Sequence, residues 1–99
     1  MMAARVSTPP DVKAATVRLV YLARLREAFG LASEQAALPA EVRDVAGITQ
    51  WLARRGGAWQ KELAAGRAFR IAVNQQMATS ATPIRDGDEV AIFPPVTGG

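Results

Sequence analysis

One amphipathic segment, residues 44–55, is the strongest helix signal in this 99-residue chain, and short apolar runs flank it on both sides. Its apolar residues recur at helical spacing and so share one face: Val45, Ile48 and Leu52. Asp44 is a suitable N-cap, and Gly56-Gly57 follows as a stop signal. A chain of this length has room for one core. The helix must therefore bury its apolar face against a sheet built from the flanking runs.

The flanking runs predict a sheet and two short helices. Short helices are expected at 25–29, closed by Gly30, and at 59–65. Turns are expected at Asn74-Gln75 and Asp86-Gly87. The predicted strands are rich in β-branched residues or bounded by turn signals: 17–22, 34–38, 70–73, 76–78 and 89–93. The sequence therefore predicts an α+β fold in which a mixed sheet packs on one main helix.

The chain divides into three parts. Residues 1–16 lack an apolar period and are expected to form a weakly ordered N-terminal extension. Residues 17–93 form the predicted domain, and residues 94–99 form a tail that begins with Pro94-Pro95. No apolar run approaches the roughly 20 residues needed to cross a bilayer, and the first residues do not resemble a secretory signal. A cytoplasmic protein with no membrane partner is therefore expected.

The composition leaves few side chains for enzyme chemistry. The chain has no cysteine and no histidine, which removes thiol nucleophiles and the commonest general base and metal ligand. Twelve basic residues against nine acidic ones give a net charge of +3, but the arginines are scattered, so no nucleic-acid partner is expected. Asp86, Asp88 and Glu89 are more typical of a turn than of a metal site. No metal and no bound cofactor are expected.

The most specific feature is the last pair of residues, Gly98-Gly99. Glycine has no Cβ, so this end can thread a narrow channel and adopt whatever dihedral angles a partner's active site imposes. The functional group is then the C-terminal carboxylate. A carboxylate is a poor electrophile and must be activated, most simply as an acyl-adenylate made with ATP. A sulfur donor can convert the adenylate to a thiocarboxylate, and such a carrier needs no thiol of its own.

Three segments resemble a known family. The run DGDEVAIFPPVTGG at 86–99 is similar to the C-terminus of the small subunit of molybdopterin synthase, the MoaD type of sulfur carrier. VNQQMA at 73–78 and YLARLREAFG at 21–30 resemble the same family. The resemblance covers about residues 17–99 and implies a β-grasp, ubiquitin-like fold.

The resemblance also implies a mechanism. Gly99, preceded by Gly98, would be adenylated by an E1-like activating enzyme, with ATP used by that enzyme, and then thiocarboxylated from a sulfur donor. The tail would enter the large synthase subunit, where the sulfur attacks cyclic pyranopterin monophosphate to build the molybdopterin dithiolene. The synthase would be a heterotetramer whose large subunits hold most of the catalytic side chains, so the small subunit is not catalytic alone.

A partner-binding surface is expected beside the tail. Alternation in the last strand places Val90 and Ile92 on one face and Phe93 on the other. Leu22 and Met77 end two other predicted strands and can join Phe93 in an exposed apolar patch. The expected partner-binding set combines this patch with the tail: Leu22, Met77, Phe93, Pro94, Pro95, Val96 and Thr97.

Two other functions share the Gly-Gly end. One is the thiamine-pathway sulfur carrier of the ThiS type, which uses the same chemistry. The other is a ubiquitin-like protein modifier, in which Gly99 forms an isopeptide bond with lysines. The Phe93-Pro94-Pro95 junction and the two-helix segment at 44–65 favour the molybdopterin type.

Overall fold

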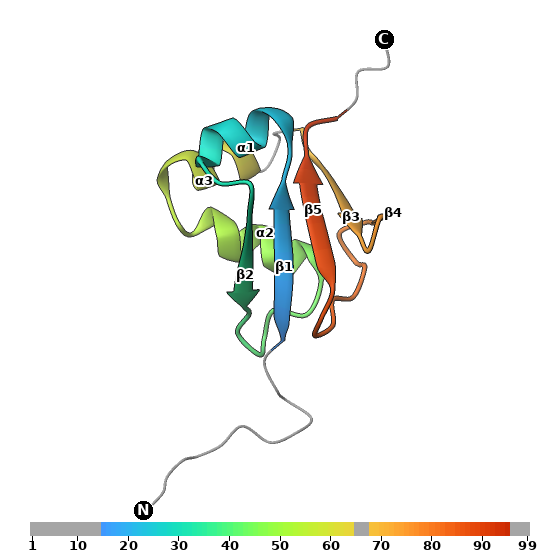
Figure 1. Ribbon diagram of the computed structural model, residues 1–99. Coiled ribbons are helices and arrows are strands. Elements are labelled where there is room, and N and C mark those ends of the chain that lie inside the picture. The colour runs from blue at the N-terminus through green and yellow to red at the C-terminus, as the bar shows by residue number, and fades with distance from the viewer. Residues whose placement is uncertain (1–14, 65–67, 96–99) are drawn as a thin grey trace, which may run out of the picture.

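A computed structural model describes residues 15–64 and 68–95. The chain alternates short strands and short helices and ends its regular structure with a strand (Figure 1). The elements in order are β1 (Thr16–Tyr21), α1 (Ala23–Phe29), β2 (Ser33–Ala37), α2 (Val45–Ala53), α3 (Gly57–Leu63), β3 (Arg70–Val73), β4 (Gln76–Met77) and β5 (Glu89–Phe93).

The five strands form one mixed sheet in the order β2-β1-β5-β3-β4. The last strand, β5, lies in the middle and pairs in parallel with β1 and antiparallel with β3. β2 and β4 are the two edges and pair antiparallel with β1 and β3. The predicted α+β fold with a mixed sheet is confirmed.

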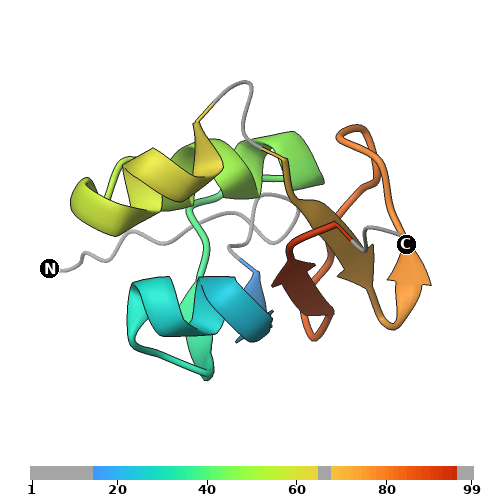
Figure 2. The same ribbon diagram turned by 90° about the horizontal axis from the view of Figure 1, so that it is seen from above.

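The helices leave one face of the sheet open. Figure 2 shows α2 and α3 together on one side of the sheet, while α1 lies at the end where β1 and β5 finish. The core lies between the sheet and α2, and the predicted apolar face of α2 is buried in it. The side chains of Leu19, Tyr21, Leu25, Ile48, Leu52, Val90 and Ile92 have no solvent exposure.

The start of α2 follows from a local hydrogen bond. The carboxylate of Asp44 accepts a bond of 2.8 Å from the backbone N–H of Gly47, which confirms Asp44 as the N-cap. A Cβ on Gly47 would lie 3.2 Å from that carboxylate and 3.4 Å from the side chain of Val42. Gly47 has a low helix propensity, but its missing side chain leaves room for the Asp44 carboxylate that caps α2.

Several boundaries differ by one or two residues from the sequence prediction, among them the starts of β1 and α3. β1 begins at Thr16, which pairs with Ala37, so the ordered sheet starts one residue before the expected domain boundary. α3 begins at Gly57 rather than at residue 59. The reason is that Gly56, with φ of 78°, is the N-cap of α3, and its carbonyl accepts the backbone N–H groups of Trp59 and Gln60. Ala15 precedes β1, and its carbonyl accepts the backbone N–H of Leu38 at 2.7 Å. Residues 1–14 of the expected extension lie outside the described residues.

None of the helices within residues 15–64 and 68–95 has the length and apolar character needed to cross a membrane.

Candidate docking face and tail base

The open face of the sheet carries the outward-facing residues of β5. Val90 and Ile92 are fully buried under the helices, as predicted from the alternation. Ala91 and Phe93 are half-buried and point to the opposite side. Phe93 is therefore the last side chain that β5 presents on the open face before the chain leaves the sheet.

The strand register brings two of the predicted patch residues to neighbouring positions. Tyr21 is paired with Ile92, and the backbone N–H of Leu22 donates to the carbonyl of Ile92 at 3.1 Å, so Leu22 lies beside Phe93. Leu22 is extended, and the chain then turns into α1 at Ala23, whose φ is 53°. This turn leaves the Leu22 side chain 42% exposed.

Met77 lies on the same face of the sheet, on the edge strand β4. It is paired with Ala72, which is paired in turn with Ala91, one position before Phe93 on β5. Its side chain is 60% exposed, and Met77 and Leu22 are the exposed large hydrophobic residues of the described part of the chain. The structure thus places all three predicted patch residues on one face, with Ala72 of β3 between Met77 and the strand that bears Phe93.

The proline pair stands at the base of the tail. Pro94 and Pro95 follow Phe93 outside the strand and are half-buried. Proline has no backbone N–H, so the pair cannot extend the ladder of β5. The remaining tail residues expected to act, Val96, Thr97, Gly98 and Gly99, lie outside the described residues.

The acidic residues before β5 bind backbone and side-chain donors. Asp86 accepts the backbone N–H of Thr16 at 2.7 Å. Asp88 accepts the backbone N–H of Arg85 at 2.8 Å and the amide of Asn74 at 2.9 Å. These carboxylates therefore serve the turn that leads into β5.

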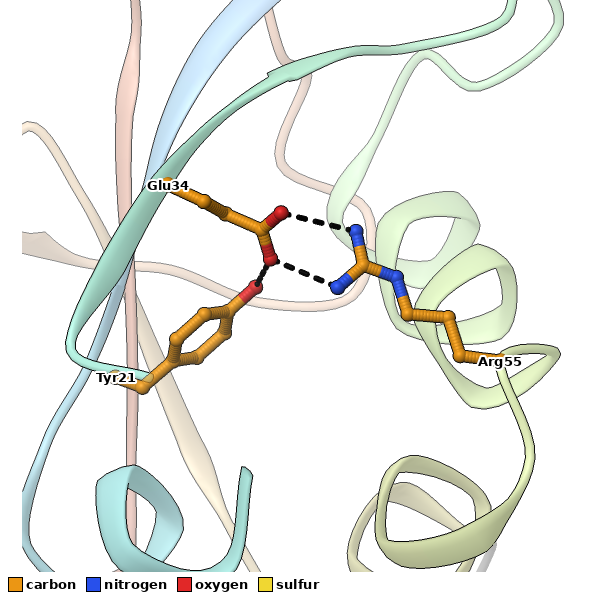
Figure 3. A network of polar contacts seen from close by, with 3 residues as sticks. All are labelled: Tyr21, Glu34 and Arg55. Carbon is orange, nitrogen blue, oxygen red and sulfur yellow. Dashed lines mark hydrogen bonds and ion pairs between the residues drawn. The ribbon is translucent and has the colours of Figure 1, made fainter. Parts of the chain in front are cut away.

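A partly exposed polar network joins the sheet to the helices (Figure 3). The hydroxyl of Tyr21 donates to Oε2 of Glu34 at 2.6 Å. The guanidinium of Arg55 donates to both oxygens of Glu34, at 2.8 Å and 3.2 Å. Glu34 comes from the edge strand β2, and Arg55 follows α2, so the network ties β1 and β2 to the helix layer.

The network perturbs the acidity of its members. Burial of Glu34 by itself raises its pKa, but hydrogen bonds from Arg55 and Tyr21 and the Arg55 charge outweigh burial and leave the pKa below its ordinary value. Burial, followed by the hydrogen bond to Glu34 and its charge, raises the pKa of the Tyr21 phenol far above its ordinary value. Hydrogen bonding to Glu34 raises the pKa of Arg55, although burial opposes this shift.

Aromatic rings surround this network. The Phe29 and Trp59 rings stack with centroids 3.9 Å apart, and Tyr21 meets each of them edge to face at 5.2 Å. The Arg55 guanidinium lies 4.4 Å from the Trp59 ring centroid and 5.4 Å from that of Trp51. Both tryptophans are partly buried and pack against the core.

The sequence prediction missed this network. Arg55 pairs with a carboxylate that lies 21 residues earlier in the chain. A usable sequence signal was present: Glu34 alternates with the apolar Ala36 and Leu38, which places it on the core-facing side of the strand. A carboxylate on that face requires a donor.

The sequence is similar to one family of proteins over most of its length. The model of the ThiS family matches residues 19–99. The molybdopterin synthase sulfur carrier subunit of Escherichia coli (strain K12) is 36% identical over 83 residues, which are 84% of this chain and 99% of that protein. The protein of the same name from Haemophilus influenzae is 31% identical over 83 residues, with the same coverage.

Solved structures show the same architecture. A Pyrococcus furiosus protein described as molybdopterin converting factor, subunit 1, superposes with a TM-score of 0.70 at 29% identity, covering 83% of this chain and 99% of that one. Small archaeal modifier protein 1 from Methanosarcina acetivorans gives a TM-score of 0.67 at 24% identity, covering 87% and 98%. The β-grasp, ubiquitin-like fold implied by the sequence motifs is confirmed.

Proposed function

The chain belongs to the ThiS family, and on that basis we propose that it is the sulfur carrier subunit of a molybdopterin synthase. The observation that carries the proposal is the identity of 36% to a protein of that name, over 99% of that protein's length. Support from the geometry is independent: an open, partly apolar sheet face adjoins the base of the tail.

In the proposed reaction the backbone carboxylate of Gly99 is the working group. A carboxylate oxygen attacks the α-phosphorus of ATP in an E1-like enzyme, which releases pyrophosphate and gives an acyl-adenylate. A sulfur donor at the oxidation level of hydrogen sulfide then displaces AMP and leaves a thiocarboxylate. In the large synthase subunit the sulfur attacks a carbon of cyclic pyranopterin monophosphate and replaces an oxygen there, which leaves as water or as a phosphate oxygen. Hydrolysis of the acyl–sulfur bond then leaves the sulfur on the pterin and returns the carboxylate. Two such cycles supply both sulfurs of the dithiolene.

The domain's part in this reaction is delivery. Phe93, Leu22 and Met77 offer an apolar contact surface to the large subunit, and the proline pair keeps the chain from continuing along the sheet. In the proposed assembly two carrier subunits bind a dimer of large subunits. The carrier holds no cofactor, and ATP is a substrate of the activating enzyme.

The test is the intact mass of the protein after incubation with an E1-like enzyme, ATP and a sulfide source. Replacement of one oxygen by sulfur is expected, and a variant that lacks Gly99 is the matched control. The charged carrier is then mixed with the large subunit and cyclic pyranopterin monophosphate, and dithiolene formation is measured. An unchanged mass with an activating enzyme that charges the Escherichia coli carrier would contradict the proposal.

A second assay separates the proposed function from the thiamine-pathway alternative. Both curated relatives carry the molybdopterin name, which favours the pterin substrate. The charged carrier is offered in parallel to a thiazole-forming synthase. Sulfur transfer to thiazole without transfer to the pterin would reverse the assignment.

A further inference from the structure

The sequence segment that contains β3 and β4 has an excess of basic residues. Residues 63–85 contain three arginines and no aspartate or glutamate. This stretch includes both β3 and β4, and Arg70 is the first residue of β3. The net charge of +3 is therefore not spread evenly over the chain.

Arg70 lies on the open face beside the base of the tail. Its partner in the register is Phe93, and its neighbour Ile71 is buried beneath the helices. Alternation along β3 thus turns Arg70 to the same side as Phe93. Leu22, Phe93 and Arg70 form one row across β1, β5 and β3, with the tail leaving from the middle position.

Arg70 has no internal counter-charge within residues 15–64 and 68–95. The ion pairs in this part of the chain join Arg18 to Glu89, Arg24 to Glu62, and Arg55 to Glu34. Arg18 is on the same open face, but its Nε lies 3.7 Å from Oε2 of Glu89, so its charge is paired. Among the residues that the structure describes, the exposed Arg70 is therefore a cation of this face without an ion-pair partner.

We infer that the open face binds a partner surface that is apolar opposite Phe93 and carries a carboxylate opposite Arg70. This inference rests on the proposed function, in which that partner is the large synthase subunit. Apolar contacts around the tail base are non-directional and leave the partner free to rotate about the tail. A charge on one side of the tail fixes that rotation, because a surface without a carboxylate would leave the guanidinium desolvated and unpaired.

The experiment measures association with the large synthase subunit from the same organism. Arg70→Glu is compared with Arg54→Glu, which makes the same charge change at an exposed residue ending α2, beneath the other face of the sheet. At an ionic strength of about 0.05 M we expect Arg70→Glu to slow association roughly tenfold or more. At about 0.5 M the difference should shrink to about twofold, because salt screens the lost attraction. Arg54→Glu should behave like the unchanged protein.

Arg70→Gln separates charge from packing, since it removes the charge without reversing it. An association rate between those of the unchanged protein and Arg70→Glu supports the inference. If both Arg70 variants lowered the association rate equally and independently of salt, the inference would be overturned, because the arginine stem would then act by packing. Equal rates for Arg70→Glu and Arg54→Glu would also overturn it and leave the proposed function intact. No binding by the folded, unchanged protein would overturn both. Circular dichroism and thermal unfolding verify that each variant is folded.

Discussion

Replacing Glu34 with glutamine tests whether the charge of this carboxylate stabilises the fold. Glu34 accepts three hydrogen bonds, two of them from the Arg55 guanidinium, and its side chain is only 21% exposed. Hydrogen bonds that involve charged groups contribute roughly 1.5–3 kcal/mol each. Glutamine can still accept one of them, and partial exposure weakens the ion pair. We therefore expect Glu34→Gln to lower the free energy of unfolding by about 2 kcal/mol at pH 7.

The same substitution should change the pH dependence of stability. The folded-state pKa of Glu34 lies below its ordinary value, so on acidification the unfolded chain takes up the proton first. The stabilisation is thus fully present above the unfolded pKa of about 4.3 and is lost as pH falls through the folded-state pKa. The difference between the unchanged protein and Glu34→Gln should shrink over that range.

Urea unfolding at a series of pH values from about 7 down to about 2 measures both effects. Glu41→Gln is the control, because it removes one negative charge from an exposed position. A difference of about 2 kcal/mol that persists unchanged at the lowest pH would refute the role of the charge. No difference at pH 7 would show that the network does not stabilise the fold.

Three further substitutions test local features. Gln75→Gly should raise the free energy of unfolding by about 0.5–1 kcal/mol in urea, because φ at Gln75 is 69°; the same change at strand residue Gln76 should lower it. Asp44→Ala should cost about 1 kcal/mol in the same assay through loss of the α2 N-cap, and an unchanged midpoint would contradict that role. Leu52→Ala should cost about 3 kcal/mol and lower the melting temperature, since the side chain is fully buried; a cost below about 1 kcal/mol would mean that the core collapses around the deletion.

Local signals were enough to predict much of the fold. The predicted strand 89–93 agrees with β5 at both ends, because a turn at Asp86-Gly87 precedes it and Pro94 ends it. Gly30 closes α1 with φ of 67°, as a C-terminal glycine should. Such boundaries are set by backbone preferences within a few residues, which the sequence displays directly.

Interactions between distant segments could not be predicted in the same way. The pairing of Arg55 with Glu34 depends on how α2 crosses the sheet, and no local spacing encodes that crossing. The stacking of Trp59 on Phe29 has the same origin. The docking face was predictable in part, since alternation gave Phe93, but the position of Arg70 beside it required the register between β3 and β5.

The central position of β5 affects how the molecule would bear mechanical load. A partner that grips the chain beyond Phe93 and pulls along the strand acts on an element held on both flanks, by β1 on one side and β3 on the other. Those ladder bonds run across the direction of the force, so they would have to break together rather than peel apart one by one. An edge strand such as β4 would unzip under a smaller tension. A pull on the tail therefore meets more resistance to unfolding than a pull on an edge strand would.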